Sequence, residues 1–338
     1  MPVPATAVSA TPSRTMAPPN STSVPPPPMA TSPPAASEKQ KGYSAGPTAI
    51  EILSVAVGPP SVPRGLRSTR SSRRTCLGRF RSEKQRALYE PLRTYLADRL
   101  EVEVELFVAN NYAGVVAALV AKQVDVAYLG GLTYTQAAEQ SPGVVPLVTE
   151  VDEETGTPRY WAAVVVRAEA PTKSVADVVA AGGRFAFGDV GSTSGSLYPR
   201  MMLVDAGAKC QPDDLNACPP LRNVTFTGGH DATAQAVLNS SVEAGGLELR
   251  ILHRLERQGT VPKGALRVVE QREVMGYPWV ARDGLDESAR QKVTDAFLAI
   301  TDPALLSLMR AKSYAAVSIA DYTEVRQNAE RLGLLTKR

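Results

Sequence analysis

Residues 188–195 read GDVGSTSG and stand between a short apolar segment, 184–187, and a segment with helical spacing. A glycine-rich turn between a strand and a helix is typical of α/β folds. Backbone N–H groups at a helix start are unpaired and carry partial positive charge, so they favour an anion. The hydroxyls of Ser192, Thr193 and Ser194 add hydrogen-bond donors, and the stretch therefore predicts a site for a tetrahedral oxyanion.

Other interpretations of residues 188–195 exist. A serine or threonine that only caps the helix would give the same pattern. The stretch lacks the Gly-Lys-Ser/Thr ending of a phosphate-binding P-loop. It does not match a nucleophile elbow either, because the middle residue of 191–195 is Thr193 rather than a serine.

A second glycine turn, TGGHD at 227–231, also lies between an expected strand and an expected helix. A lone histidine is more often structural, but His230 follows the hydroxyl stretch in a neighbouring strand–turn–helix unit, which favours a ligand contact. A triad of Ser192 or Ser194 with His230 and a carboxylate is the catalytic alternative, and no further motif supports it.

Two tyrosines complete the candidate site. Tyr112 lies in NYAG (111–114), at an expected strand-to-helix turn, and Tyr160 begins an expected strand in RYW (159–161). A tyrosine offers an apolar ring and a hydrogen-bonding hydroxyl, which suits a ligand cleft. Both could equally be ordinary half-buried tyrosines.

Strand-like and helix-like segments alternate over most of the chain. We expect helices at 89–100, 113–122, 174–181, 194–207, 231–239, 287–300, 303–312 and 319–332. We expect strands at 52–58, 101–109, 124–129, 144–151, 161–167, 184–187, 224–227, 267–270 and 278–282. This alternation predicts parallel sheets with helices on both faces, and the length predicts two lobes.

The first 49 residues are different in composition. Twelve of the 27 prolines lie in residues 1–48, and no Leu, Ile or Phe occurs before Ile50. We predict a disordered tail at 1–49, with a targeting peptide as the alternative, since no apolar signal stretch is recognisable. The Arg-rich segment 64–86 is expected to be a solvated loop rather than a basic arm, because it holds few aromatic residues for nucleic-acid stacking.

Composition excludes several classes. With 37 Lys+Arg against 34 Asp+Glu, the chain is not a wholly basic nucleic-acid binder, and no apolar run is long enough for a transmembrane helix. Two histidines and three cysteines argue against a metal site, and we expect no cofactor. Cys210 and Cys218 could form a disulfide around a polar loop or stay as reduced thiols, and Cys76 is left unpaired.

Residues 87–325 resemble the substrate-binding proteins of phosphonate, phosphite and phosphate ABC transporters. The most specific match is the STSG loop followed by GHD at 229–231, in this order and spacing. Supporting matches are YEPL at 89–92, NYAG at 111–114, VDVAYLG at 124–130, YW at 160–161, Pro199, AQAV at 234–237 and VEAG at 242–245.

The resemblance implies a two-lobed α/β fold of the type II periplasmic binding proteins, with a two-strand hinge near 160–167 and 278–282. Lobe 1 would hold 50–167 and 278–338, and lobe 2 would hold 168–277. It implies a non-catalytic protein that binds its ligand in the interlobe cleft and meets a membrane permease in the periplasm or at the membrane, with no role for nucleic acid. The implied ligand contacts are Ser192, Thr193, Ser194, His230, Tyr112 and Tyr160.

Some features depart from the family. Arg250 and Tyr277 stand where family members that bind amino-phosphonates place carboxylates, with Glu248 only nearby, which favours a simpler anion. The sequence leaves open whether that anion is phosphonate, phosphite or phosphate. The alternatives in function are an intracellular or organellar sensor without transport, and a cleft hydrolase that uses Ser194 and His230.

Overall fold

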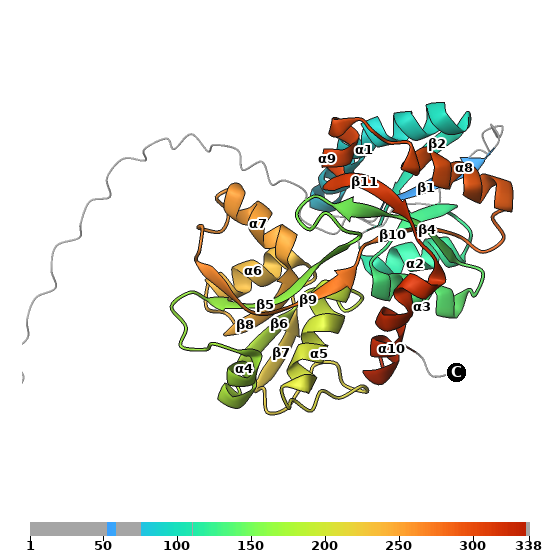
Figure 1. Cartoon of the computed structure of the whole chain (residues 1–338). Helices are drawn as coiled ribbons and strands as arrows, with labels where there is room; N and C mark the ends of the chain where they lie inside the picture. Colours follow the sequence, from blue (N-terminus) through green and yellow to red (C-terminus); the bar gives the residue numbers. More distant parts are fainter. Residues whose placement is uncertain (1–52, 59–75, 110, 336–338) are drawn as a thin grey trace, which may run out of the picture. The chain divides into compact units, whose positions relative to one another are not determined.

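The computed structural model describes residues 53–58, 76–109 and 111–335 (Figure 1). The predicted tail at 1–49 and the Arg-rich segment up to residue 75 lie outside this part. Two β-sheets, each with its own helices, make up the described chain.

The first sheet has the spatial order β11 (Ala311–Ala316), β4 (Val145–Asp152), β10 (Pro278–Ala281), β3 (Val126–Tyr128), β1 (Leu53–Gly58) and β2 (Glu103–Val108). The second has the order β7 (Asn223–Phe226), β6 (Arg184–Phe187), β8 (Ala244–Glu248), β5 (Arg159–Arg167) and β9 (Leu266–Met275). We call the first sheet with its helices lobe 1 and the second lobe 2.

The helices of lobe 1 are α1 (Cys76–Leu100), α2 (Tyr112–Val120), α3 (Gly131–Gln140), α8 (Glu287–Leu298), α9 (Pro303–Leu308) and α10 (Thr323–Arg331). Those of lobe 2 are α4 (Val175–Ala181), α5 (Tyr198–Asp205), α6 (His230–Leu238) and α7 (Leu249–Arg257). None of the helices in these described ranges is long and apolar enough to cross a membrane.

The prediction of parallel sheets is wrong for lobe 1, where every described strand pair is antiparallel. In lobe 2, β6 is parallel to β7 and β8, whereas β5 is antiparallel to β8 and β9. Strand β10 directly follows β9 of the other sheet, with no helix between them. No strand–helix–strand crossover within lobe 1 therefore makes β10 parallel to its neighbours.

The chain passes between the sheets twice, at 153–158 and at 276–277. The prediction that lobe 1 extends to residue 167 is therefore one strand too long, because β5 pairs along its whole length within the second sheet. The apolar run of β5 carries no signal for which sheet it joins, since both of its sides are buried.

Helix α1 begins at Cys76 and not at residue 89, so the expectation of a loop at 64–86 is wrong for residues 76–86, and Pro91 lies inside the helix. Its buried stripe consists of Tyr89, Leu92, Leu96 and Leu100. The prediction missed α3, α7, β8 and β11. Strand β8 is hard to detect because Gly245 and Gly246 lie in it, and a Cβ at Gly246 would approach the Pro199 ring of α5 too closely.

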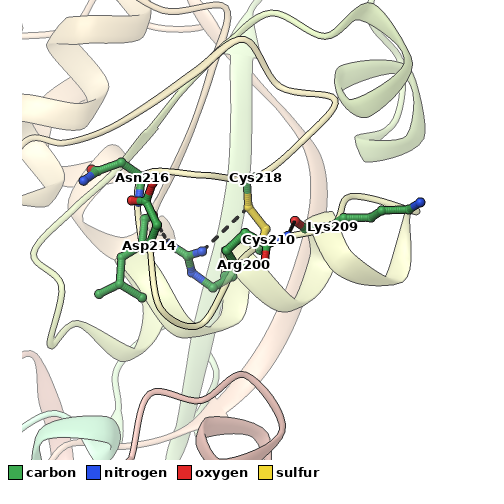
Figure 2. The surroundings of a disulfide bond; sticks show 8 residues. Arg200, Lys209, Cys210, Asp214, Asn216 and Cys218 are labelled. Carbon is green, nitrogen blue, oxygen red and sulfur yellow. Dashed lines mark hydrogen bonds between the residues drawn. A yellow bond between two sulfur atoms is a disulfide. The ribbon is translucent and has the colours of Figure 1, made fainter.

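Cys210 and Cys218 form a disulfide, which decides between the two states that the sequence left open (Figure 2). The side chain of Arg200, on α5, donates to the Leu215 carbonyl at 2.7 Å and to Cys218 Sγ at 3.7 Å. Its guanidinium also lies over the Phe187 ring, 4.6 Å from the centroid, and burial lowers its pKa to about 10. The bridge and Arg200 together fasten the 211–217 loop to lobe 2.

Candidate ligand-binding site

The predicted oxyanion stretch leads from β6 into a π-helical turn, Thr193–Leu197, that continues as α5. Ser192 caps this turn, because its Oγ accepts a 2.9 Å hydrogen bond from the Gly195 N–H. The Gly188 N–H donates to the Gly195 carbonyl at 2.8 Å and closes the loop. A Cβ at position 195 would lie 2.9 Å from His230 Cε1, so only a glycine lets the loop and the histidine come this close.

Two threonines connect this loop to lobe 1. Thr193 Oγ1 accepts a 2.9 Å hydrogen bond from the Leu132 N–H in the first turn of α3. In return, Thr133 Oγ1 donates to the Gly191 carbonyl at 2.9 Å. All of these groups are buried. Thr193 therefore lies in the candidate site and also joins the two lobes.

Ser194 and Ser196 are fully buried, and the Oγ of neither has a hydrogen-bond partner. Folded proteins leave few buried polar groups unpaired, because each unpaired group costs about 1–3 kcal/mol. Two such hydroxyls, two residues apart in one turn, indicate a place where a polar ligand supplies the missing partner.

His230 is the first residue of α6 and is only 3% exposed. Its Nδ1 accepts a 3.1 Å hydrogen bond from the Glu248 N–H, so in the neutral ring the proton is on Nε2. Burial lowers the pKa of His230 to about 4, although the Glu248 carboxylate acts in the opposite direction. Nε2 has no hydrogen-bond partner, and His230 therefore offers one N–H donor at neutral pH.

Tyr112 begins α2, and its Cβ is 3.2 Å from the place where a Cβ at Gly191 would stand. Tyr160 lies on β5 with its ring centroid 5.1 Å from that of Tyr277. Both tyrosines are buried, and the hydroxyl of each lacks a hydrogen-bond partner. Burial raises the pKa of Tyr112 and of Tyr160, and nearby Ser192 and Ser194, respectively, offset part of the rise.

A fully buried ionic cluster lies beside His230. The Arg250 guanidinium donates from Nε to Glu248 Oε1 at 2.6 Å, and from Nη1 to Asp152 Oδ2 at 2.7 Å and Glu150 Oε1 at 3.4 Å. It also lies over the Tyr160 ring, 4.7 Å from the centroid. Because Glu150 and Asp152 come from β4, the cluster links the two lobes.

Glu248 stays ionised in this cluster. Burial alone would raise its pKa, but the charges of Arg250, Arg310 and His230 and a hydrogen bond from Tyr277 outweigh burial and lower the pKa to about 2. The Tyr277 hydroxyl donates to Oε2 at 2.8 Å. By contrast, burial keeps the pKa of Glu150 raised despite the same arginine.

The structure brings the six residues predicted from sequence into one region. Gly195 contacts both Ser192 and His230, Gly191 contacts Tyr112, Thr193 follows in the same turn, and Ser194 is near enough to Tyr160 to affect its pKa. Four side-chain atoms of these six residues have no hydrogen-bond partner: Tyr112 Oη, Tyr160 Oη, Ser194 Oγ and His230 Nε2. All four can donate a hydrogen bond, which is what an oxyanion requires.

A groove of about 510 Å³ reaches this region from the outside. It is lined among others by Asn111, Tyr112, Gln136, Asp189 and Gly191, and so it runs between α2, α3 and the oxyanion loop. Among the residues of the described ranges, no group of three or more His, Cys, Asp or Glu side chains is placed to hold a metal ion.

Sequence reasoning missed two parts of the site. The first is the start of α3, whose Leu132 and Thr133 bond to the loop. The signal was present, because GG at 130–131 follows a short apolar strand in the same way as the two glycine turns of lobe 2. The second is Glu248, which the sequence placed only nearby and which lies 4.0 Å from His230 Nε2.

Residues 77–322 match the family model described as "ABC transporter, phosphonate, periplasmic substrate-binding protein". The chain belongs to this family. The resemblance drawn from the STSG and GHD motifs is thereby confirmed. The family is one of transporter substrate-binding proteins and not of enzymes, in agreement with the predicted non-catalytic role.

Two curated relatives of this chain are named for what they import or bind. The phosphate-import protein PhnD of Mycolicibacterium smegmatis is 29% identical over 215 residues, which cover 63% of this chain and 66% of that protein. The phosphonates-binding periplasmic protein of Escherichia coli is 29% identical over 227 residues, which cover 65% of this chain and 64% of that protein. The chain thus spans slightly less than two thirds of the length of each relative.

Among solved structures, PhnD1 from Prochlorococcus marinus in complex with methylphosphonate has a TM-score of 0.63 at 22% identity, covering 74% of this chain and 94% of that one. A phosphonate transporter binding protein from Pseudomonas aeruginosa has the same TM-score of 0.63 and the same identity of 22%, covering 74% of this chain and 82% of that one. This likeness confirms the predicted two-lobed binding-protein fold of this chain.

Proposed function

We propose that the chain is the substrate-binding component of an ABC transporter and that it captures a phosphonate, phosphite or phosphate between its lobes for uptake. The observation that supports this most is the group of buried, unpartnered donors on Tyr112, Tyr160, Ser194 and His230. They come from both lobes and surround a loop whose sequence already favours an oxyanion. Membership of the family and the ligands for which the relatives are named support the same chemistry.

Ser192 and Thr193 complete the proposed ligand shell. The hydroxyl oxygen of each already accepts a bond from a backbone N–H, so the hydroxyl hydrogen is free to point at the ligand. The six side chains carry no net charge at neutral pH, since His230 is neutral there. The ligand charge is then stabilised by oriented dipoles, which replace the hydration shell.

The free energies of these hydrogen bonds are large enough for the micromolar affinity that suits a transport protein. A hydrogen bond to a charged group contributes about 1.5–3 kcal/mol, whereas micromolar affinity needs about 8 kcal/mol. Six such bonds contribute about 9–18 kcal/mol, which exceeds that requirement and leaves a margin for the cost of desolvating the anion and ordering the lobes.

We propose that ligand entry requires the lobes to separate about the two connections at 153–158 and 276–277. Separation would break the hydrogen bonds that Thr133 and Thr193 make across the lobes. Ligand bound to both lobes favours the arrangement described here, and that arrangement would be the one a membrane permease recognises.

We further propose that the protein works in the periplasm. The family description names that compartment, and the Cys210–Cys218 disulfide suits an oxidising one. Cell fractionation tests the proposal, together with a thiol-labelling assay on the unreduced protein. Recovery in the cytosolic fraction with both thiols free would contradict it.

Binding is tested on the full chain by thermal shift and calorimetry with methylphosphonate, phosphite and phosphate. A ligand at 100 times its Kd stabilises by about 2.7 kcal/mol, which raises the Tm by several degrees. No stabilisation by any of the three ligands at millimolar concentration would overturn the proposed function.

Two variants assign the binding to this site. Ser194→Ala removes one donor, and His230→Asn removes Nε2 but keeps an acceptor for the Glu248 N–H, so each should weaken binding by about tenfold or more. Ser288→Ala on the exposed face of α8 and His253→Asn at the surface are the matched controls and should bind as the wild type does.

A further inference from the structure

The Glu248 carboxylate contrasts with the donors around it. It is fully buried, and its Oε2 lies 4.0 Å from His230 Nε2, too far for a direct hydrogen bond. Oε1 is held by Arg250 at 2.6 Å, and Oε2 accepts from Tyr277 at 2.8 Å. A carboxylate oxygen can accept two hydrogen bonds, so Oε2 has capacity for one more.

The 4.0 Å separation of these two groups suits one bridging oxygen atom. An atom about 2.8 Å from His230 Nε2 and about 2.8 Å from Glu248 Oε2 satisfies normal hydrogen-bond lengths to both. That atom must accept a bond from the histidine N–H and donate one to the carboxylate. A hydroxyl oxygen does both, whereas an ammonium only donates and a bare oxyanion oxygen only accepts.

We infer that Glu248 is a specificity-determining residue of the proposed site, because it accepts the O–H of a protonated phospho-anion and disfavours oxyanions that carry no proton. This inference rests on the proposed function. Phosphoryl groups lose their second proton only near pH 6–7, so a protonated form is available at neutral pH. Sulfate has no such proton at neutral pH and would place a bare oxygen against the carboxylate.

The surroundings of Glu248 keep it an acceptor. Arg250 follows it at the start of α7, Tyr277 comes from the connection between β9 and β10, and His230 comes from α6. The charges of Arg250 and Arg310 favour its ionised form, and the charge of Glu248 in turn raises the pKa of Tyr160 and of Tyr112. The carboxylate thus has no proton of its own to give a bare oxyanion.

The test measures phosphate, phosphite and sulfate binding to the full chain by calorimetry at pH 7. We expect sulfate to bind at least 100-fold more weakly than the better phospho-anion. In Glu248→Gln, whose amide can donate as well as accept, this ratio between the sulfate Kd and the phospho-anion Kd should shrink at least tenfold. Asp231→Asn, an acid in the first turn of the same α6 helix, is the control and should keep the gap.

A second measurement uses the wild type alone. At a pH well above the second pKa of the ligand, binding of the protonated form must take up close to one proton per ligand from the buffer. Calorimetry in buffers of different ionisation enthalpy counts that proton. His230 could take it up instead, and uptake that persists unchanged in Glu248→Gln would assign the proton to the histidine.

The outcomes separate the two proposals. Tight phosphate or phosphite binding with equal sulfate binding, or with a gap unchanged in a folded Glu248→Gln, overturns the role of Glu248 and leaves the proposed function intact. No binding of any phospho-anion overturns both. If Glu248→Gln does not fold, proton uptake by His230→Asn decides, because that variant cannot take up the proton on the histidine: about one proton per ligand supports the role and none overturns it.

Discussion

The Glu248 N–H donates a 3.1 Å hydrogen bond to Nδ1 of His230, and this contact fixes the tautomer of a buried histidine. Since Nδ1 is an acceptor, the neutral ring must carry its proton on Nε2, the nitrogen that has no partner. The strand end at β8 therefore determines what the start of α6 presents to a ligand. Neither residue could do this alone.

The same histidine should make stability depend on pH. Its folded-state pKa of about 4 lies below the ordinary 6.5, because burial disfavours the charged ring. The stability contributed by the neutral ring is complete above pH 6.5 and is lost as the pH falls through 4. By linkage this loss amounts to about 3 kcal/mol.

Urea unfolding at pH 7.5, 5.5 and 4.5 measures this dependence. We expect His230→Asn to be less sensitive to pH than the wild type between 6.5 and 4.5, while His253→Asn should follow the wild type. Equal slopes for His230→Asn and wild type would contradict the assignment. Glu248 acts in a separate window, because its pKa of about 2 affects stability only below its ordinary 4.5.

Gly195→Ala should impair binding more than folding. The new Cβ would lie 2.9 Å from both His230 Cε1 and Ser192 Oγ, so it must displace a ligand-facing group. We expect at least a tenfold loss of affinity for the best phospho-anion by calorimetry. Gly188→Ala in the same loop is the control, because its Cβ meets nothing closer than 3.5 Å. An equal loss of affinity in both variants would mean that a change in the loop backbone, and not the displaced histidine, weakens binding.

Sequence alone predicted the local features of this site well. The strand–loop–helix order around GDVGSTSG and TGGHD follows from glycine, hydroxyl and apolar spacing, and those signals lie within one segment. The structure places both loops against each other at Gly195 and His230. Their ligand role stays a prediction until binding is measured.

What sequence could not supply are the long-range partners. The sequence marks Arg250 only as a departure from the family and Glu248 only as a neighbour, and only the fold brings Glu150 and Asp152 of β4 against Arg250. The lobe assignment of β5 failed for the same reason. Strand pairing depends on contacts distant in sequence, and hydrophobic periodicity does not encode them.

Thr133→Val should weaken ligand binding without weakening the fold. The substitution keeps the shape of the side chain and removes the hydroxyl that donates to the Gly191 carbonyl across the lobes. If the lobes separate in the free protein, this bond exists only in the joined arrangement. Its loss of about 1 kcal/mol should then increase ligand dissociation roughly fivefold, which stopped-flow fluorescence measures.

Thr135→Val is the matched control for that experiment. Its hydroxyl is equally buried but donates to the Leu132 carbonyl within its own helix, so it should leave the dissociation rate unchanged. A faster rate in both variants would assign the effect to α3 itself.

Arg250→Met should destabilise the fold strongly. The arginine contacts three buried carboxyl groups, and removing one partner of a buried ionic cluster typically costs about 3–5 kcal/mol because uncompensated charge remains. Part of that charge should disappear by protonation, since Glu248 loses the positive neighbour that lowers its pKa. The variant should therefore regain stability relative to the wild type as the pH is lowered from 8 to 6. Urea unfolding across this range checks both statements.

Arg272→Met, which breaks partly exposed pairs with Asp205 and Glu270, should cost about 1 kcal/mol or less and show no such recovery. Similar losses for the two arginines would mean that the buried cluster contributes no more than a surface pair.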